Sequence, residues 1–369
     1  MTTTRATTDV PISEVSAHAY TIPTDEPESD GTLKWDSTTL VIVTAHAGGQ
    51  TGLGWTYGHS ALRHVINSDL ARAVIGLPAT DVPRAWAAMA TALRNSGRPG
   101  MGSMAIAAVD VALWDLKAKL LSLPLATLLG RFHQSVPIYG SGGFTSYSDS
   151  RLRTQLADWV QQGITMVKMK IGREPAQDPS RVAAARKAIG PDVRLFVDAN
   201  GAYRPAEAIA VAHELADFDV SWFEEPVSSE DLEGLRTVRE QVPAGMAIAA
   251  GEYGDDLSYF QRMLDAHAVD VLQADVTRCG GISGLLRVDA LCRARSRPLS
   301  LHCSPTIHGN VAVALETMVH VEYFHDHVRM EDMLFDGAAL ARGGALWPNV
   351  DVPGMGVEFR WSDAERYAA

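Results

Sequence analysis

Ionisable side chains recur at nearly regular intervals through the second half of this 369-residue chain. Each lies in or at the end of a short apolar run, and from the second member onward successive ones are 20 to 28 residues apart. They are Lys168, Lys170, Asp198, Glu224, Glu252, Asp275, His302 and Glu322. One such step is about the length of a strand plus a helix, and a (β/α) barrel builds its active site at the carboxyl ends of successive strands. The spacing therefore predicts a parallel barrel with one polar mouth.

Strand-like runs alternate with helical stretches from residue 136 onward. The runs are 136–139, 165–171, 194–198, 221–224, 247–251, 269–273, 299–302 and 320–323. Eight strands alternating with helices favour a closed parallel barrel. An open doubly wound sheet is the alternative, but it would gather its site residues at one switch point, whereas here they come from successive units.

The first third of the chain has a mixed α+β pattern. We expect strands at 15–22 and 38–45 and helices at 81–96 and 103–121. The segment 23–31, which reads PTDEPESDG, is polar, acidic and rich in turn residues. We therefore expect it to be a mobile surface loop.

Composition restricts the class of protein. The net charge of −12 argues against a sequence-independent nucleic-acid binder, which needs a basic face. The three cysteines show no paired spacing, so we expect no disulfide framework and a reducing cytoplasm. The opening MTTTRATTDV lacks the basic and apolar regions of a signal peptide, and no apolar run is long enough to cross a membrane.

Three carboxylates follow consecutive apolar strands. Asp198, Glu224 and Glu252 would repel one another strongly at one barrel mouth unless a cation lay between them. Oxygen-only ligands favour a hard cation, and open positions for substrate oxygens favour Mg²⁺. For any one of these acids alone, a solvated loop acid or a helix cap is the alternative. The three together predict a magnesium site.

Two lysines stand on the strand before these acids. Lys168 and Lys170 are two residues apart, so their side chains point to the same face of a strand. Each cation lowers the pKa of the other, which predicts that Lys170 is a neutral base. The alternative is an outward-facing pair on a solvated rim.

Further polar residues end other strands. Asp275 and His302 follow consecutive strands, and a carboxylate beside an imidazole fixes its tautomer and raises its basicity. A protonated Glu322 on the last strand would hydrogen-bond an oxyanion from the side opposite the metal. Asn200, two residues after Asp198, is a candidate substrate contact. For Glu322 a surface acid remains the alternative, and for Asn200 a simple turn.

These motifs together resemble the enolase superfamily, specifically its mandelate racemase subgroup. They are the helix at 108–117, Val167-Lys168-Met169-Lys170, Val197-Asp198-Ala199-Asn200, Trp222-Phe223-Glu224-Glu225-Pro226, Gly251-Glu252, Asp275 with Cys279-Gly280-Gly281, and His302. Enzymes of this superfamily use a Lys or His base, with Mg²⁺ stabilising an ene-diolate.

The resemblance implies a fold and a division into domains. The fold is a (β/α)7β modified TIM barrel with an α+β capping domain. The cap would comprise residues 1–133, the barrel residues 134–340, and residues 341–369 would return to the cap. The segment 23–31 would be the flexible lid that shapes substrate choice. A homo-oligomer, up to an octamer, is also implied.

The resemblance assigns a role to each site residue. Mg²⁺ would lie on Asp198, Glu224 and Glu252, with Lys170 and the His302–Asp275 pair as opposed bases, Lys168 as electrostatic partner and Glu322 as the acid opposite the metal.

The implied reaction is removal of the proton α to a carboxylate of a small-molecule substrate. We favour an acid-sugar dehydratase, because a polar, acidic lid suits a polyhydroxy acid. A racemase or epimerase and a cycloisomerase remain open. A metal-free aldolase that forms a Schiff base on Lys170 and a non-catalytic sugar-acid-binding protein are alternatives from other classes.

Overall fold

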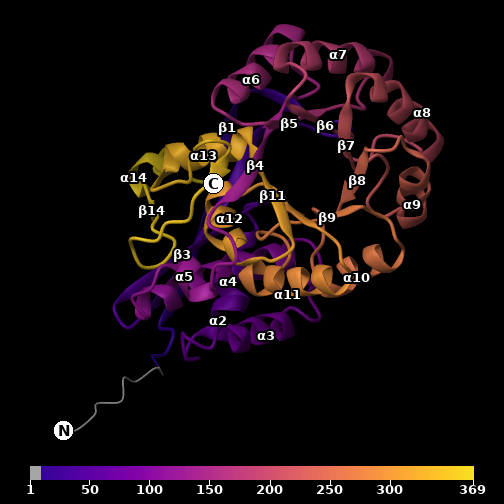
Figure 1. Cartoon of the computed structure of the whole chain (residues 1–369). Coiled ribbons are helices and arrows are strands. Elements are labelled where there is room, and N and C mark those ends of the chain that lie inside the picture. Colours follow the sequence, from indigo (N-terminus) through magenta and orange to yellow (C-terminus); the bar gives the residue numbers. More distant parts are fainter. Residues whose placement is uncertain (1–9) are drawn as a thin grey trace.

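The computed structural model describes residues 10–369. Most of the N-terminal stretch considered above for a signal peptide lies outside these residues. Within them, none of the helices is both long enough and apolar enough to cross a membrane. The described chain forms an N-terminal sheet covered by helices, beside a closed barrel (Figure 1).

The N-terminal domain is built on a three-stranded antiparallel sheet. Its strands, in spatial order, are β1 (Glu14–Ser29), β2 (Lys34–Ala47) and β3 (Gln50–Tyr57). The helices that follow are α1 (Leu62–Val65), the π-helical turn η1 (Ile66–Leu70), α2 (Ala71–Val74), α3 (Val82–Ala92), α4 (Met101–Leu120) and α5 (Leu125–Leu129). The expected strands and the two expected long helices of this domain are confirmed.

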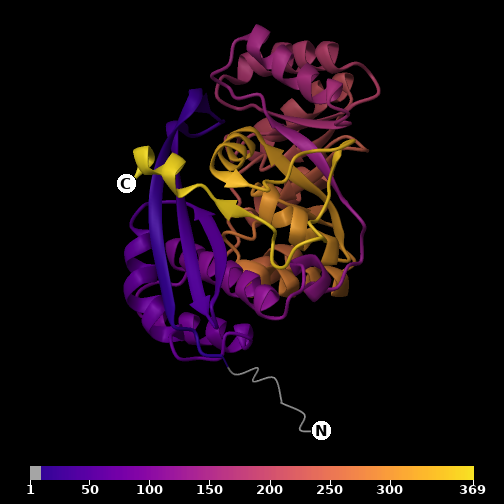
Figure 2. The ribbon, with the colours of Figure 1, turned by 90° about the vertical axis from the view of Figure 1, so that its left-hand side faces the viewer.

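Strand β2 is buried on both faces, and its two faces pack into the cores of two different domains. Side chains alternate along a strand, so Val41 and Val43 face one way and Leu40 and Ile42 the other. Val41 and Val43 pack into the core formed with α3 and α4, whereas Leu40 and Ile42 belong to the core that includes the barrel. The sheet is therefore a shared wall between the cap and the barrel (Figure 2).

Eight parallel strands close the barrel. They are β4 (Val136–Gly142), β5 (Met166–Lys170), β6 (Arg194–Asp198), β7 (Val220–Glu224), β8 (Ala247–Ala250), β9 (Val271–Ala274), β10 (Leu299–Leu301) and β11 (Met318–Phe324). Each pairs with its neighbour, and β11 pairs with β4 to complete the ring. The predicted (β/α)7β barrel is confirmed, and the open sheet is excluded.

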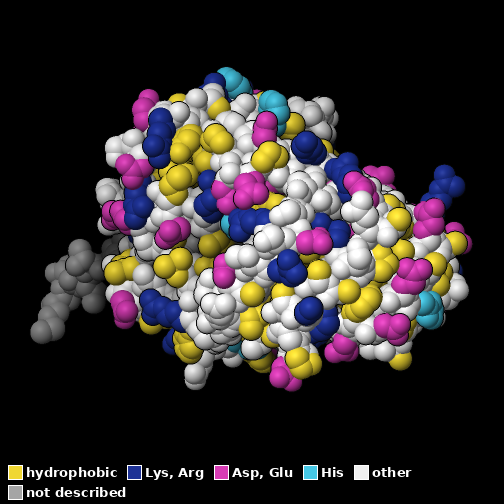
Figure 3. All heavy atoms as spheres, turned by 90° about the horizontal axis from the view of Figure 1, so that it is seen from above, with side chains coloured by type: hydrophobic (Ala, Val, Ile, Leu, Met, Phe, Trp, Pro, Cys, Tyr) yellow, Lys and Arg dark blue, Asp and Glu magenta, His cyan; other side chains and the backbone are white. Residues whose placement is uncertain are grey.

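Helices surround the strands (Figure 1). They are α6 (Asp149–Gln161), η2 (Pro175–Gln177), α7 (Asp178–Ile189), α8 (Pro205–Leu215), η3 (Ala216–Phe218), α9 (Leu232–Gln241), α10 (Leu257–Asp265), α11 (Gly281–Ala294), α12 (Pro305–Val311), η4 (Ala312–Ala314) and α13 (His325–Leu334). Seen from above, the molecule carries acidic and basic side chains interspersed with apolar ones, so no single charge dominates this face (Figure 3).

The acidic segment 23–31 is only partly the surface loop we expected. Pro23 and residues 25–27 are exposed, but after a register shift between Pro23 and Glu28, β1 continues to Ser29, and Glu28 and Ser29 are buried. The backbone oxygen of Ser29 accepts from the amide of Thr145, and that of Pro23 accepts from Arg329 at 2.7 Å. The sequence did not indicate the buried part, because these partners, on the barrel rim, are more than 100 residues away in the chain.

The residues after the barrel return along both domains. Strand β12 (Phe335–Asp336) pairs with β14 (Glu358–Phe359), and β13 (Ala345–Leu346) adds antiparallel to β4. Helix α14 (Trp361–Ala364) and the turn η5 (Glu365–Tyr367) then lie against the cap, where the amide of Ala369 donates to the oxygen of Ala19 (Figure 2).

Candidate active site

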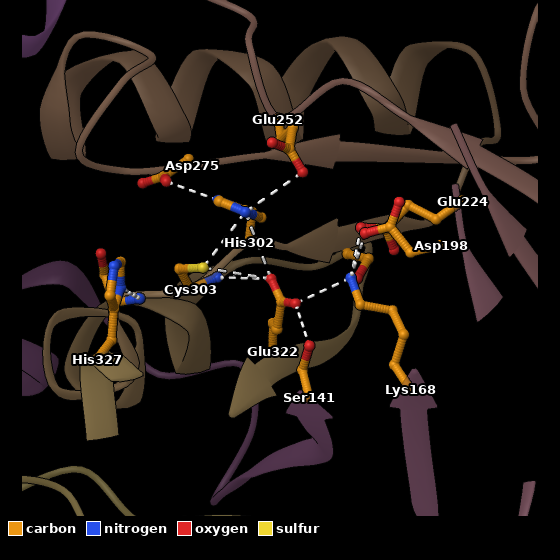
Figure 4. A network of polar contacts seen from close by, with 12 residues as sticks. Ser141, Lys168, Asp198, Glu224, Glu252, Asp275, His302, Cys303, Glu322 and His327 are labelled. Atoms are coloured by element: carbon orange, nitrogen blue, oxygen red, sulfur yellow. Dashed lines mark hydrogen bonds and ion pairs between the residues drawn. The ribbon is translucent and has the colours of Figure 1, made fainter. Parts of the chain in front are cut away.

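Three carboxylates end neighbouring strands on one side of the barrel mouth. Asp198 and Glu224 are the last residues of β6 and β7 and lie opposite each other in the parallel ladder, and Glu252 follows β8 by two residues. All three are buried, and one oxygen of each lies within 4.8 Å of the others (Figure 4). The structure thus brings together the three acids that the sequence singled out.

The chemistry of this set fits a hard divalent cation. Burial and the neighbouring Asp198 raise the pKa of Glu224 to about 8, because two adjacent negative charges repel in this buried place. Oε2 of Glu252 accepts no hydrogen bond from residues 10–369, although Nε2 of His302 lies 3.3 Å away. Three convergent carboxylates, one of them incompletely paired, are a ligand set suited to Mg²⁺.

Lys168 and Lys170 point from β5 into the same mouth. Nζ of Lys168 contacts Glu224 and lies 2.8 Å from Oε1 of Glu322, and Nζ of Lys170 lies 2.5 Å from Oδ2 of Asp198. Burial alone would lower the pKa of Lys170, but the Asp198 carboxylate outweighs it and the pKa is raised. Next to Asp198 the raised pKa disfavours the neutral form that we expected of Lys170, because a carboxylate on the next strand outweighs the neighbouring lysine.

His302 and Asp275 form a hydrogen-bonded pair. Nδ1 of His302 lies 2.8 Å from Oδ2 of Asp275, and Thr277 donates to the other carboxylate oxygen at 2.7 Å from its amide. Burial opposes an imidazolium, yet Glu252, Glu322 and Asp275 together raise the pKa of His302. The expected increase in basicity agrees with this direction.

Glu322 lies between the lysine and the histidine (Figure 4). Ser141 donates to its Oε1 at 2.5 Å, and its Oε2 lies 3.5 Å from Nε2 of His302. Burial favours the neutral acid, but Lys168 and His302 outweigh it and hold the pKa of Glu322 well below its ordinary value. We expected a protonated acid, and these two cationic neighbours instead favour the carboxylate.

Asn200 lies in the turn after β6 and lines the same cavity. Its φ of 46° is left-handed, and its amide donates to Oδ1 of Asp198 at 2.9 Å. Its side-chain Oδ1 is buried and accepts no hydrogen bond from residues 10–369. The residue forms a turn and also leaves one acceptor free beside the cavity.

The site residues open into a cavity of about 470 Å³. Lys170, Glu252 and His302 line it, and Arg278 and His59 add cationic or polar groups. Five further lining residues are aromatic and come from both domains: Trp35, Tyr57, Tyr253, Phe324 and His327. The cavity therefore combines charged groups with aromatic and small polar ones.

Our interpretation of the sequence missed three residues that hold the site in place. Arg278 lies 3.2 Å from Oε1 of Glu252 and 3.6 Å from Oδ2 of Asp275. Nε1 of Trp222 donates to Oε2 of Glu224 at 2.9 Å, and Ser141 donates to Glu322 as described. Trp222 stands two residues before Glu224, and that period-2 spacing was the signal that could have identified it.

A capped (β/α)7β barrel with three carboxylates, two lysines and a His–Asp pair at its mouth has the makeup of a metal-assisted proton-transfer enzyme. Family comparison agrees. Residues 151–364 match the enolase C-terminal domain-like family, and residues 22–130 match the N-terminal domain of mandelate racemase and muconate lactonizing enzyme. The chain therefore belongs to the mandelate racemase subgroup of the enolase superfamily, as its motifs indicated.

Individual relatives align over almost the whole chain. A 3,6-anhydro-alpha-L-galactonate cycloisomerase of Streptomyces coelicolor is 33% identical over 94% of this chain and 96% of its own length. A mandelate racemase/muconate lactonizing enzyme-like protein of Rubrobacter xylanophilus is 54% identical, with a TM-score of 0.96 over 97% of this chain and 100% of that one.

A third relative was crystallised with a metal. The L-talarate/galactarate dehydratase of Salmonella typhimurium, liganded with Mg and L-lyxarohydroxamate, is 27% identical, with a TM-score of 0.89 over 100% of this chain and 95% of that one.

Proposed function

We propose that this protein is a Mg²⁺-dependent acid-sugar dehydratase that removes the proton α to a carboxylate through an ene-diolate. The observation that carries this proposal is the arrangement of the barrel mouth. A cluster of three carboxylates lies beside a cavity that Glu252, Lys170 of β5 and His302, which is paired with Asp275, all line. The relative named as a dehydratase and liganded with Mg supports both the reaction class and the metal.

Asp198, Glu224 and Glu252 would hold the ion. When bound, Mg²⁺ would neutralise charge developing on the substrate carboxylate and compete with Lys170 for the negative charge of Asp198. We assign Lys168 to the same developing charge, because its Nζ is buried among acids and stays protonated. Burial would lower its pKa, but Glu224 and Glu322 outweigh that and raise it well above the ordinary value.

We assign the two proton transfers to opposite groups. Lys170, as the neutral amine, takes the α-proton and leaves an ene-diolate. The His302 imidazolium then gives a proton to the 3-hydroxyl, the C–O bond breaks, and water leaves. Asp275 keeps the imidazole ring in position for this transfer.

Glu322 and Asn200 complete the assignment. Glu322 faces both Lys168 and His302, and a bound anion beside it would favour its protonated, hydrogen-bond-donating form. The free Oδ1 of Asn200 would accept a hydrogen bond from a substrate hydroxyl.

Cycloisomerisation is the second candidate. It is favoured by the relative named as a cycloisomerase, whose alignment covers nearly all of both chains. Aromatic walls such as Trp35 and Tyr57 would pack against the apolar face of a cyclic sugar acid equally well. Racemisation requires that the second base return a proton to the opposite face, and the same opposed pair could do this.

Exchange of the substrate α-proton in D₂O tests the proposal. Purified protein with Mg²⁺ is mixed with a library of mono- and diacid sugars and their lactones, and exchange and products are followed by NMR. We expect exchange, with loss of water from at least one open-chain acid. Glu252→Gln should abolish turnover and weaken Mg²⁺ binding, whereas Glu233→Gln, an exposed glutamate on α9, should change neither.

Other outcomes of this screen have distinct meanings. Conversion of lactones alone would favour the cycloisomerase. Full activity in chelator, with borohydride trapping on Lys170, would replace the magnesium mechanism with a Schiff base. A complete lack of exchange across the library would favour a sugar-acid-binding protein.

We also propose where and in what form the enzyme acts. The three cysteines are buried and unpaired, which supports a reducing cytoplasm. Phe132 and Trp347 are 61% and 52% exposed beside the same surface cavity, which supports a homo-oligomer of up to eight chains. Light scattering of the purified protein tests the oligomer, and cell fractionation tests the compartment.

A further inference from the structure

Three potential ligands of another kind meet beside the carboxylate cage (Figure 4). Sγ of Cys303 lies 3.2 Å from Nε2 of His302 and 3.4 Å from Oε2 of Glu322. Nε2 of His302 lies 3.5 Å from the same Glu322 oxygen. The mouth therefore has an oxygen-only corner and a separate corner that offers nitrogen, sulfur and oxygen.

These distances suit one tetrahedral ion. With Zn–S about 2.3 Å and Zn–N or Zn–O about 2.0–2.2 Å, donor atoms of a tetrahedral site are about 3.4–3.6 Å apart. The separations of 3.4 and 3.5 Å fall in this range, and the sulfur–nitrogen separation of 3.2 Å lies just below it. Oε2 of Glu252, which belongs to the proposed magnesium site, lies 3.3 Å from Nε2 of His302, so the two sites would adjoin.

The backbone and the neighbouring acid orient these ligands. Cys303 and the following Ser304 both have left-handed backbone, with φ of 53° and 45°, which is costly for residues other than glycine and turns the thiol toward His302. Asp275 accepts the proton on Nδ1 of the neutral His302, so the lone pair of Nε2 points toward the thiol. A carboxylate behind a histidine is the usual support of zinc ligands.

We propose that His302, Cys303 and Glu322 form a second cation site, selective for thiophilic divalent ions such as Zn²⁺ and Cd²⁺. Mg²⁺ is not expected there, because it prefers oxygen ligands only. Binding forms a metal–sulfur bond and releases the thiol proton to solvent. Burial raises the pKa of the Cys303 thiol, so the proton leaves only when the ion arrives.

Occupation of this site blocks the enzyme. The ion takes the lone pair of Nε2, so His302 can neither accept nor donate a proton. His302 and Cys303 both line the cavity, which gives the ion a path from solvent. Inhibition rests on the proposed function, whereas binding of the ion does not.

Cadmium is the probe that tests the site. The purified protein, saturated with Mg²⁺, is titrated with Cd²⁺ while the ultraviolet sulfur-to-cadmium charge-transfer band and the heat of binding are recorded. We expect one Cd²⁺ per chain with a sulfur band, and dehydration that falls with the same midpoint. Cys303→Ser should lose the band and bind at least tenfold more weakly.

Two further variants make the result decisive. Cys292→Ser removes a buried cysteine on α11 and should behave as wild type. His302→Asn keeps the thiol and should lower the affinity at least tenfold, so it decides the outcome if Cys303→Ser does not fold. Cd²⁺ that binds without a sulfur band, that displaces Mg²⁺ one for one, or that binds both variants as tightly as wild type would overturn the proposal. Because these readouts need no turnover, they remain interpretable if the proposed dehydratase activity is absent.

Discussion

The two halves of the barrel mouth solve different electrostatic problems. From β5 to β8, two lysines and three carboxylates are buried together, and each charge is tolerable only because of the others. From β9 to β11, Asp275 and Glu322 are charged as well, but directed hydrogen bonds also set the positions of His302 and Cys303. Loss of a buried charge should therefore be most damaging in the first half, and loss of a correctly oriented side chain in the second.

Removal of the Lys168 charge should have the largest effect of these changes on stability and turnover. In Lys168→Met, the acids Glu224 and Glu322 lose their buried cation, which should cost roughly 3 to 5 kcal/mol of stability without metal. Turnover should be lost. Thermal unfolding with and without Mg²⁺ measures the change, and Mg²⁺ should restore more stability to the variant than to wild type because it supplies the missing charge.

Lys187→Met is the matched control for this variant. Lys187 is exposed on α7, so its loss should change neither stability nor the response to Mg²⁺. If Lys168→Met unfolds at the same temperature as the control, the buried charges of this half do not depend on one another.

Loss of His302 should separate the two halves in activity. His302→Asn should slow dehydration by roughly 10²- to 10⁴-fold, the usual contribution of a general acid or base. Exchange of the α-proton that depends on Lys170 should persist. NMR of both reactions measures the effect, and His213→Asn, at an exposed position on α8, is the control. Survival of both activities would contradict the His302–Asp275 assignment.

A buried acid on α13, outside the barrel mouth, should make the free energy of unfolding depend on pH. Glu331, on α13, is buried, and burial raises its pKa to about 7 from an ordinary 4.5, against hydrogen bonds from Thr306 and Tyr57. Because the pKa of Glu331 is higher in the folded than in the unfolded protein, its protonation stabilises the fold fully below pH 4.5. This stabilisation is lost as the pH rises through about 7.

The expected loss is roughly 3 kcal/mol between these limits. Glu331→Gln, which keeps a neutral side chain, should remove it, so denaturant unfolding of this variant should vary less with pH than that of wild type. Glu214→Gln, at an exposed position on α8, should leave the wild-type slope unchanged. Equal slopes for Glu331→Gln and wild type would mean that Glu331 is not the neutral acid.

The smallest expected effect concerns a hydrogen bond to a metal ligand. Trp222→Phe removes the donor to Glu224 and should weaken Mg²⁺ binding about tenfold, as loss of an outer partner usually does. Trp114→Phe is the control, since Nε1 of Trp114 also donates a hydrogen bond, to Ser283, but away from the mouth. Calorimetric titration distinguishes them, and equal affinities would mean that Glu224 needs no such support.

The sequence predicted what local patterns determine. Apolar runs of the right length, each followed by an acid or a histidine, were enough to locate the barrel strands and to bring Asp198, Glu224, Glu252 and His302 to one mouth. In a parallel barrel the carboxyl ends of all strands lie at the same mouth. The position of a residue at the end of its own strand is therefore enough to place it in the site.

Protonation and burial could not be predicted in this way. The neighbour of Lys170 in the sequence is Lys168, but the group that determines its pKa is Asp198, on the next strand. The segment 23–31 looked solvated because the barrel residues that receive it lie more than 100 positions later. Both depend on contacts that exist only after the barrel closes.

The docking of the last described residues on the cap has a consequence for synthesis. The final barrel strand ends at Phe324, whereas Ala368 and Ala369 pair with Tyr20 and Ala19 on the outer strand of the cap. A ribosome therefore delivers every barrel strand before the segment that covers this strand. Until that segment emerges, the nascent protein exposes an unpaired edge of β1, the kind of edge through which partly made chains associate.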